Sequence, residues 1–181
     1  MKIKHRFTNH QLNPATEILI IGTFNPETDK NPADFFYGRS RNHLWQLLPV
    51  SFGLPNLKGK SKEEKNNFLK KMKIDFIDIV GEIEVDEGAE TNYKDGFIDD
   101  KITMHHDVIK QMKKLKNLNK VCFTRKTFGD IPNMKKEIKK IEAYCKEHKI
   151  FFQYLVTPAR IYEEAKQKEW TNFFQKDSWQ E

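Results

Sequence analysis

Asn25 and Pro26 follow directly on an apolar run at residues 18–21, in the stretch ILIIGTFNPE. Proline fixes its own φ and keeps the preceding residue out of the α-helical region, so the backbone that carries Asn25 is conformationally restricted. A carboxamide held in this way can orient a water molecule or hydrogen-bond to a reacting centre, although it is too weak a base to act alone. The alternative is that Asn25 only shapes the turn, as asparagine often does.

A second group of candidate residues follows at 35–43. Three consecutive aromatic residues at 35–37 precede a polar turn that contains Arg39, Arg41 and Asn42. Aromatic side chains beside a strand end suit stacking on a planar ring, but they also suit a hydrophobic core. The polar turn is able to position phosphate groups, and it is equally consistent with a solvated loop.

These candidates need a scaffold, and four apolar runs predict it. The runs lie at 18–21, 76–80, 121–123 and 150–156. Because they lack period-two alternation and are separated by amphipathic stretches, we expect strands covered on both faces by helices. The predicted fold class is α/β, a three-layer α/β/α sandwich with a central four-stranded parallel sheet. Such sheets bind ligands at the carboxyl ends of their strands, where Asn25 would lie.

Several helices can also be predicted. Ser61 and Glu64 form a capping-box pattern that opens a helix extending to Met72. A helical stripe beginning at Asn133 predicts a second helix that packs on the sheet. A further stripe predicts a helix over 102–115, which would put the neighbouring His105 and His106 at the helix surface or core edge. The acidic segment at 82–100 shows little periodicity and is predicted to be a long surface loop, either a lid or an insertion.

Length and composition bound the class of protein. The 181 residues, 38% hydrophobic and 32% charged, fit a single domain spanning 1–181. No apolar stretch reaches membrane-spanning length and the N-terminus lacks the apolar core of a secretion signal, so we expect a cytoplasmic protein. The two cysteines, Cys122 and Cys145, are interpreted as buried thiols. They are too few for a four-cysteine metal site, and we expect neither metal nor cofactor.

The charge is distributed unevenly along the chain. The formal net charge is +6, and since residues 82–100 carry −7, the other 162 residues carry +13. If this positive charge lies on one face, it would attract a polyanion such as nucleic acid. A lysine-rich solvated surface would give the same count.

Taken together, GTFNPE and YGRSRNHLWQLL resemble the uracil-DNA glycosylase superfamily. Its mismatch-specific uracil/thymine branch has a strand, a G-I-N-P-G turn, an aromatic residue, a polar turn and N-[RH]-F-W at the start of a helix. The matching residues here are Gly22, Asn25, Pro26, Tyr37, Asn42, His43 and Trp45. Segments 76–80, 123–125 and 157–160, the last before Trp170, resemble later motifs of the hypoxanthine-DNA glycosylase-like branch. The resemblance spans roughly residues 18–170.

The resemblance implies a uracil-DNA glycosylase-like fold and a monofunctional DNA glycosylase that hydrolyses the N-glycosidic bond of a flipped uracil or hypoxanthine. The site must then direct water at an oxocarbenium-like sugar and stabilise the departing base. By this resemblance Asn25 holds the water and Tyr37 stacks on the base. Backbone N–H groups of Thr23 and Phe24 contact the base, and Asn42 supports the pocket or binds a phosphate.

The second motif implies contacts with DNA. Thr157 and Arg160, together with Arg39 and Arg41, are expected to bind the phosphate backbone. A helix beginning near Pro158 would offer unpaired N–H groups to a phosphate. Arg160 or Ile161 is expected to enter the duplex where the base leaves. VTPAR contains neither the histidine nor the asparagine of related motifs, so the group that stabilises the leaving base is unassigned.

Two other functions are consistent with the residues. One is a catalytically weak or inactive relative that binds nucleic acid or a modified nucleotide without releasing a base. The other is an unrelated α/β enzyme acting on a phosphorylated small molecule, which the lack of a glycine-rich phosphate loop disfavours. For the glycosylase we expect DNA with a damaged or mismatched base as the partner, no membrane contact and a monomer.

Overall fold

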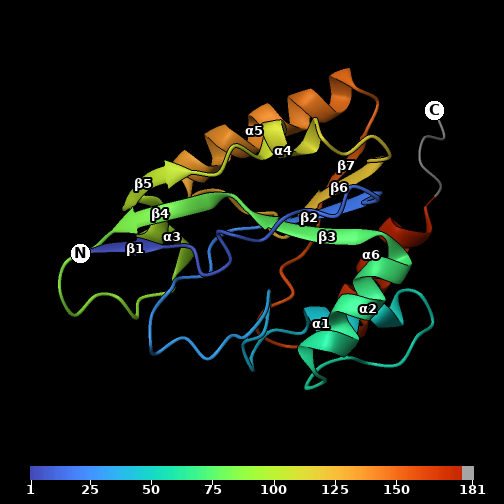
Figure 1. Ribbon diagram of the computed structural model, residues 1–181, viewed down its shortest axis with the longest axis horizontal. Coiled ribbons are helices and arrows are strands. Elements are labelled where there is room, and N and C mark those ends of the chain that lie inside the picture. The colour runs from blue at the N-terminus through green and yellow to red at the C-terminus, as the bar shows by residue number, and fades with distance from the viewer. Residues whose placement is uncertain (177–181) are drawn as a thin grey trace.

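The computed structural model describes residues 1–176 and contains the predicted four-stranded parallel sheet (Figure 1). The strand order is β3-β2-β6-β7, and every neighbouring pair is parallel. The bounds are β2 (Ile18–Gly22), β3 (Ile74–Asp78), β6 (Lys120–Phe123) and β7 (Phe151–Tyr154). Ile20 of β2 pairs with Phe76 on one side and Cys122 on the other, so β2 is central and buried on both faces.

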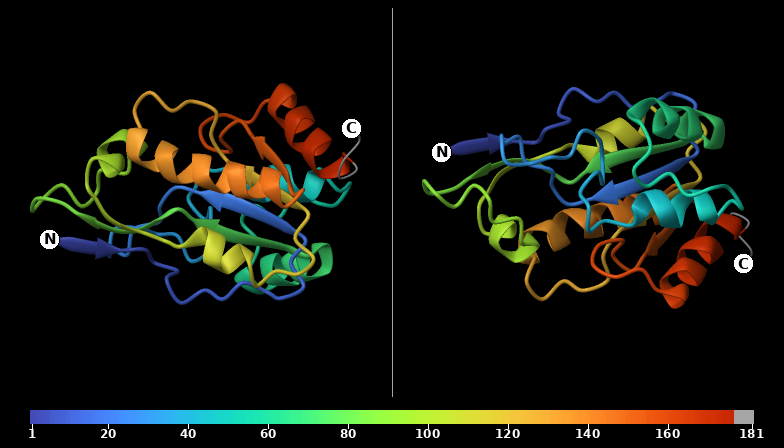
Figure 2. Two further views of the ribbon diagram at one scale, coloured as in Figure 1. Left: turned by 90° about the horizontal axis from the view of Figure 1, so that it is seen from above. Right: turned by 90° about the horizontal axis from the view of Figure 1, so that it is seen from below.

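Helices cover both faces of this sheet, which confirms the three-layer α/β/α prediction (Figures 1 and 2). Side chains of β2 alternate between two cores: Leu19 and Ile21 face one, and Ile18 and Ile20 face the other. One face is covered by α4 (Val108–Met112) and α5 (Pro132–Glu147). The opposite face is covered by α1 (Leu44–Val50), α2 (Lys62–Met72) and α6 (Glu164–Gln175).

Local sequence signals explain two of these helices. The Ser61 hydroxyl accepts from the Glu64 N–H at 3.2 Å and the Glu64 carboxylate accepts from the Ser61 N–H at 2.9 Å, which is the predicted capping box. In α5 the predicted stripe is buried: Met134, Ile138, Ile141 and Cys145. Both helices therefore begin and pack as their patterns predict.

A second, three-stranded antiparallel sheet extends from the first and was not predicted. It consists of β1 (Lys2–Lys4), β4 (Val80–Glu84) and β5 (Ile102–His105), in the order β1-β4-β5. The apolar run at 76–80 therefore contains the end of β3 and the start of β4. The helix predicted over 102–115 is wrong: only 108–112 is helical, because residues 102–105 pair with β4.

The acidic segment is only partly a loop. Residues 82–84 belong to β4, and α3 (Asp95–Asp99) follows a loop. Asp99 is 1% exposed and its carboxylate accepts from the N–H groups of Asn133 and Met134 at 2.8 and 2.7 Å. These N–H groups lie in the first turn of α5, so Asp99 caps that helix from outside and complements its dipole. This part of the acidic segment is structural.

The two cysteines lie in the core. Cys122 and Cys145 are both free and fully buried, as predicted, and burial raises the pKa of Cys145 to about 12. Within residues 1–176 we find no helix that combines the length and the hydropathy needed to cross a membrane.

Candidate functional site

A cleft of about 680 Å³ opens at the carboxyl ends of β2, β6 and β7, the edge at which the sequence predicts a site. This volume falls within the range of about 300–1,000 Å³ that is typical of small-molecule pockets. Eight of the nine predicted site residues line the cleft: Thr23, Phe24, Asn25, Tyr37, Arg39, Asn42, Thr157 and Arg160. The ninth, Arg41, is exposed and is not among the lining residues.

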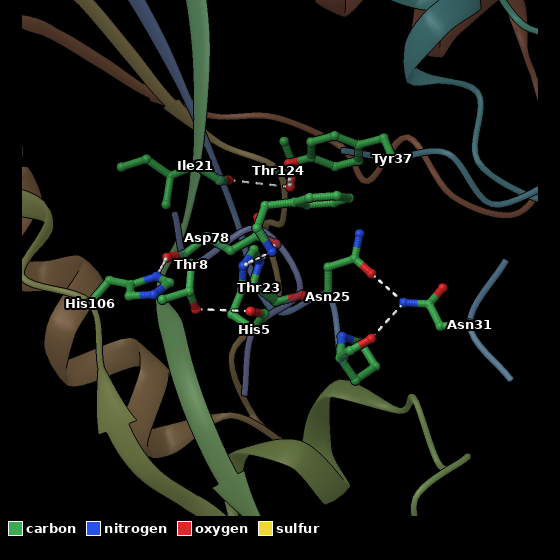
Figure 3. Close-up of polar contacts among 12 residues, drawn as sticks. His5, Thr8, Ile21, Thr23, Asn25, Asn31, Tyr37, Asp78, His106 and Thr124 are labelled. Atoms are coloured by element: carbon green, nitrogen blue, oxygen red, sulfur yellow. Dashed lines mark hydrogen bonds and ion pairs between the residues drawn. The ribbon is translucent and has the colours of Figure 1, made fainter. Parts of the chain in front are cut away.

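Asn25 forms part of the cleft wall and is only 7% exposed. Its side-chain oxygen accepts from Nδ2 of Asn31 at 2.5 Å (Figure 3). Its backbone carbonyl accepts from the Arg6 N–H at 2.7 Å, and a β-bridge joins His5 and Pro26. The carboxamide is thus held from both its backbone and its side chain, as a positioned catalytic group requires.

Of the three consecutive aromatic residues, only Tyr37 lines the cleft. Phe35 and Phe36 are 3% and 2% exposed and pack in the core with Trp45. Tyr37 has a φ of 56°, an uncommon left-handed conformation for a bulky residue. Its ring contacts Phe76 with the centroids 5.4 Å apart.

The Tyr37 hydroxyl lies 3.3 Å from the Thr124 hydroxyl, at the end of β6 (Figure 3). Burial of the ring, reinforced by the nearby Asp78 carboxylate, raises the pKa of Tyr37 well above its ordinary value. A Cβ on Gly22 would lie 2.2 Å from Asp78 Oδ1 and 2.6 Å from the Tyr37 hydroxyl. Gly22 is therefore needed so that both side chains can lie over the end of β2.

A histidine and carboxylate network lies behind this wall. Nδ1 of His5 accepts from the Phe7 N–H at 3.1 Å, so the proton is on Nε2, which donates to Asp78 Oδ2 at 2.7 Å. Nδ1 of His106 lies 2.8 Å from the backbone carbonyl of Asp78 and donates to it. Burial lowers the pKa of His106, which favours its neutral form. These contacts fix Asp78 beneath the cleft.

Three of the charged residues that line the cleft are joined by ion pairs: Asp95, Arg125 and Asp130. The Arg39 guanidinium stacks over the Tyr93 ring at 4.0 Å, and burial lowers the pKa of Arg39. Burial alone would also lower the pKa of Arg125, but its ion pairs with Asp130 and Asp95 outweigh this effect and raise it.

Asp95 connects the acidic segment to the predicted base-binding turn. One carboxylate oxygen accepts from Arg125 at 2.7 Å and the other accepts from the Thr23 hydroxyl at 3.0 Å. Tyr93, Lys94 and Asp95 all line the cleft, so this end of the acidic segment forms one of its walls.

The two predicted motifs meet at the cleft. The His43 N–H donates to the Pro158 carbonyl at 2.8 Å, and the Arg160 N–H donates to the Arg41 carbonyl at 3.0 Å. Residues 42 and 159 form a β-bridge. The first polar turn and the later 157–160 segment are thereby joined through their backbones.

No helix begins near Pro158, which corrects that prediction. α6 starts at Glu164, and the preceding segment is irregular. Its carbonyls at Ala159 and Ile161 instead accept from the buried Lys166 ammonium at 3.0 and 2.7 Å. Ile161 is left 69% exposed next to the cleft residue Arg160.

Sequence reasoning assigned no role to several residues of the candidate site, and most of these meet their partners across long stretches of the chain. Asn31, Asp95, Thr124 and Arg125 contact predicted site residues or line the cleft, and Asp78 lies close to the Tyr37 hydroxyl at the end of β2. The position of Asp78, Thr124 and Arg125 at strand ends is a signal that could have marked them. Within residues 1–176, no group of three or more His, Cys, Asp or Glu side chains could hold a metal ion.

The comparisons with known proteins bear on the fold. Neither the models of protein families nor the curated proteins match the sequence. The structure is similar to the solution NMR structure of a putative uracil DNA glycosylase from Methanosarcina acetivorans, with a TM-score of 0.63 and 20% sequence identity, over 91% of this chain and 92% of that one. With its four-stranded parallel sheet between two helical layers, the chain therefore has a uracil-DNA glycosylase-like fold.

Proposed function

We propose that the protein is a monofunctional DNA glycosylase, which hydrolyses the N-glycosidic bond of a deaminated base, uracil or hypoxanthine, flipped out of DNA. The observation that carries this proposal is the position of Asn25. Its carboxamide is clamped on the wall of a cleft of about 680 Å³, which Tyr37 also lines. The uracil DNA glycosylase activity proposed for the protein from Methanosarcina acetivorans supports the same class of reaction.

The proposed chemistry needs only water and positioned polar groups. Water attacks the anomeric carbon as the bond to the base breaks, and the electron pair of that bond leaves with the base. The water loses one proton to solvent as the sugar hydroxyl forms, and the departed base takes up one proton from solvent. An oxocarbenium-like sugar forms at the transition state, so a fixed dipole and a fixed water accelerate the step. Asn25 supplies the dipole and Tyr37 stacks on the base. Thr23 and Phe24 offer backbone N–H groups to the base, and Asn42 supports the pocket.

Contacts with the rest of the DNA come from the cleft rim. Arg39, Thr157 and Arg160 line the cleft and Arg41 is exposed beside it, which suits contacts with the phosphates that flank a flipped nucleotide. Ile161 is 69% exposed, and an apolar side chain at this position suits insertion into the space that the base leaves. We further propose that residues 1–181 act as a single domain and as a monomer in the cytoplasm.

Water rather than lysine is the proposed nucleophile. Of the two lysines that line the cleft, Lys126 forms an ion pair with Glu169 at 2.5 Å. The other, Lys94, is exposed in the acidic segment and lies outside the matched motifs. A Schiff base would be trapped by borohydride as a covalent complex between protein and DNA. We expect no such complex.

The test uses oligonucleotides carrying uracil, hypoxanthine or thymine opposite guanine, followed by alkali to cut at abasic sites. Asn25→Ala should abolish cleavage while DNA binding is retained. Asn67→Ala, an exposed substitution on α2, is the matched control and should cut at the rate of the unchanged protein. Normal cleavage by Asn25→Ala would show that the assignment of Asn25 is wrong.

The second candidate is a relative that binds nucleic acid or a modified nucleotide without cutting it. The sequence of residues 157–160 favours this candidate, because it has neither the histidine nor the asparagine of related motifs that would stabilise a leaving base. It predicts saturable binding of the same oligonucleotides with no abasic product from any of them.

A further inference from the structure

The structure assigns Asn31 as a positioning residue that fixes which end of the Asn25 carboxamide faces the cleft. The amide nitrogen of Asn25 faces the cleft, and its oxygen is turned toward Asn31. This inference rests on the proposed function, because it gives Asn25 a more specific role within the same site.

Asn31 is 3% exposed, and both its side-chain oxygen and its side-chain nitrogen are paired. Its Oδ1 accepts from the Ala33 N–H at 3.2 Å. Its Nδ2 donates to Asn25 Oδ1 at 2.5 Å and to the Pro26 carbonyl at 2.8 Å (Figure 3). Rotating this amide by 180° would set its oxygen against a carbonyl and its nitrogen against an N–H group. Only one orientation satisfies every partner.

The orientation of Asn31 decides that of Asn25. Because Asn31 presents N–H groups to Asn25, the atom of Asn25 that meets them must be an acceptor, namely Oδ1. A reversed Asn25 would bring two NH₂ groups together in a buried place, at the cost of unsatisfied donors. Figure 3 shows Oδ1 directed at Asn31 and the amide nitrogen directed away from it.

Arg6 holds the segment that carries Asn31. One guanidinium nitrogen donates to the carbonyls of Asn31 and Ala33 at 2.5 and 2.8 Å, and the other donates to the Thr28 carbonyl at 2.7 Å. The N–H of Arg6 also donates to the carbonyl of Asn25. The planar fork of arginine therefore ties this segment to Asn25 itself, and a lysine could not replace it.

The chemical consequence is that Asn25 presents donors to the substrate. A cleft-facing NH₂ group donates to an acceptor atom on the departing base, such as a carbonyl oxygen, where negative charge grows as the bond to the sugar breaks. Water can still be held by the second lone pair of Oδ1. Asn25 would thereby also supply the stabilisation of the leaving base that no residue of the VTPAR segment was expected to provide.

The first experiment tests, without any reaction, whether Asn31 presents its N–H groups to the side chain at position 25. In Asn25→Asp, the new carboxylate keeps the hydrogen bond from Asn31, which favours its charged form. We expect its pKa, followed by carbon-13 NMR, to rise in Asn25→Asp/Asn31→Leu, with a fall in the acid dissociation constant of at least about tenfold. Asn25→Asp/Asn67→Leu is the control and should titrate like Asn25→Asp. Equal titration in all three proteins would overturn the inference.

A second measurement covers the case in which Asn31→Leu fails to fold. Exchange of side-chain amide protons can be followed in the unchanged protein, with the Asn25 signal identified by its loss in Asn25→Ala. We expect the cleft-facing amide of Asn25 to exchange with water at least about tenfold faster than that of the buried Asn31. A protected Asn25 amide beside a freely exchanging Asn31 amide would overturn the orientation.

The kinetic measurement separates this inference from the proposed function. If the protein cleaves a damaged base, Asn31→Leu should lower kcat by roughly 100-fold with little change in KM, because the reacting group is misplaced and the base still binds. A change in KM alone would contradict a positioning role. If no base is cleaved by the unchanged protein, the proposed function fails, while the titration and the exchange still decide the orientation.

Discussion

The Asp95 carboxylate accepts a hydrogen bond from the Arg125 guanidinium at 2.7 Å on the wall of the candidate cleft. The other oxygen of Asp95 accepts from the Thr23 hydroxyl, so a residue of the acidic segment reaches the turn that is expected to hold the base. This carboxylate occupies positions that a phosphate oxygen would otherwise be able to take. The pairing therefore moderates the positive charge of the cleft.

Asp95→Asn should increase affinity for DNA. Loss of one negative charge leaves Arg125 available to a phosphate, while Asp130 still contacts the guanidinium. We expect tighter binding and a slope of log affinity against log salt that is steeper by about one. Fluorescence anisotropy at several salt concentrations measures both. Asp86→Asn, with a side chain 93% exposed in the same segment, is the control. An unchanged salt slope in Asp95→Asn would show that Arg125 does not meet phosphate.

Gly22→Ala should disrupt the site and destabilise the fold. The added Cβ would lie 2.2 Å from Asp78 Oδ1 and 2.6 Å from the Tyr37 hydroxyl, distances that force both side chains to move. Overpacking of this kind costs about 1–3 kcal/mol in the free energy of unfolding. Urea denaturation measures this cost. Gly129→Ala is the matched control because its Cβ meets nothing within 4 Å. Equal stability of the two variants would mean that Asp78 and Tyr37 can move aside at little cost in the free energy of unfolding.

Sequence predicted the parts of the molecule that depend on local patterns. The buried run of β2, the capping box at Ser61 and the stripe of α5 each follow from residues close together in the chain. The antiparallel sheet was missed because β1 and β4 are short and pair over about eighty residues, for example Ile3 with Ile83. Such pairing is set by tertiary packing and leaves a weak local signal.

In the candidate site, too, local sequence patterns mark some residues and leave others unmarked. Asn25 and Tyr37 could be named because a turn pattern and a resemblance mark them. His5 and Asp95 could not, because their partners Asp78 and Thr23 lie 73 and 72 residues away and are brought near only by folding. Asn31 is only six residues from Asn25, but it stands in an irregular loop whose local sequence does not indicate which side chains meet. Arg39 was expected to contact phosphate, and the structure adds a stacking contact with Tyr93 that sequence could not indicate.

Tyr37→Phe should separate stacking from hydrogen bonding. The substitution keeps the ring that contacts Phe76 and removes only the hydroxyl 3.3 Å from Thr124. We expect base cleavage to fall less than about fivefold in Tyr37→Phe and by roughly 10- to 100-fold in Tyr37→Ala, since stacking contributes about 1–3 kcal/mol. Single-turnover rates on the preferred oligonucleotide compare the two. Equal losses would assign the effect to the hydroxyl and contradict a stacking role.

Stability should decline as the pH falls below about 6.5, partly because of His106. Burial lowers the pKa of His106 in the folded protein from its ordinary value of 6.5, so the unfolded chain binds the proton more readily. The contribution of neutral His106 to the free energy of unfolding is present above pH 6.5 and is lost as the pH falls through the pKa of His106 in the folded protein. His106→Asn, which can still donate to the Asp78 carbonyl, should make the decline between pH 7.5 and 5.5 shallower.

Urea denaturation across this pH range measures the decline. His148→Asn, exposed at the end of α5, is the control and should retain the slope of the unchanged protein. Burial also lowers the pKa of His105, so His106→Asn should reduce the slope without abolishing it. An identical slope in His106→Asn and the unchanged protein would show that His106 titrates alike in the folded and unfolded states.

Ile161→Ala should slow the cleavage of double-stranded substrates selectively. Ile161 is 69% exposed beside Arg160, and its carbonyl is fixed by Lys166, so a large apolar side chain is held in water at the edge of the cleft. A wedge that fills the space of a flipped base offsets the cost of unstacking, which arises in duplex DNA and much less in a single strand. We expect roughly tenfold slower cleavage in duplex and nearly unchanged cleavage in single strands. Met104→Ala, 46% exposed on β5 and outside the cleft lining, is the control. Equal slowing on both substrates would assign Ile161 to the fold of the segment rather than to the duplex.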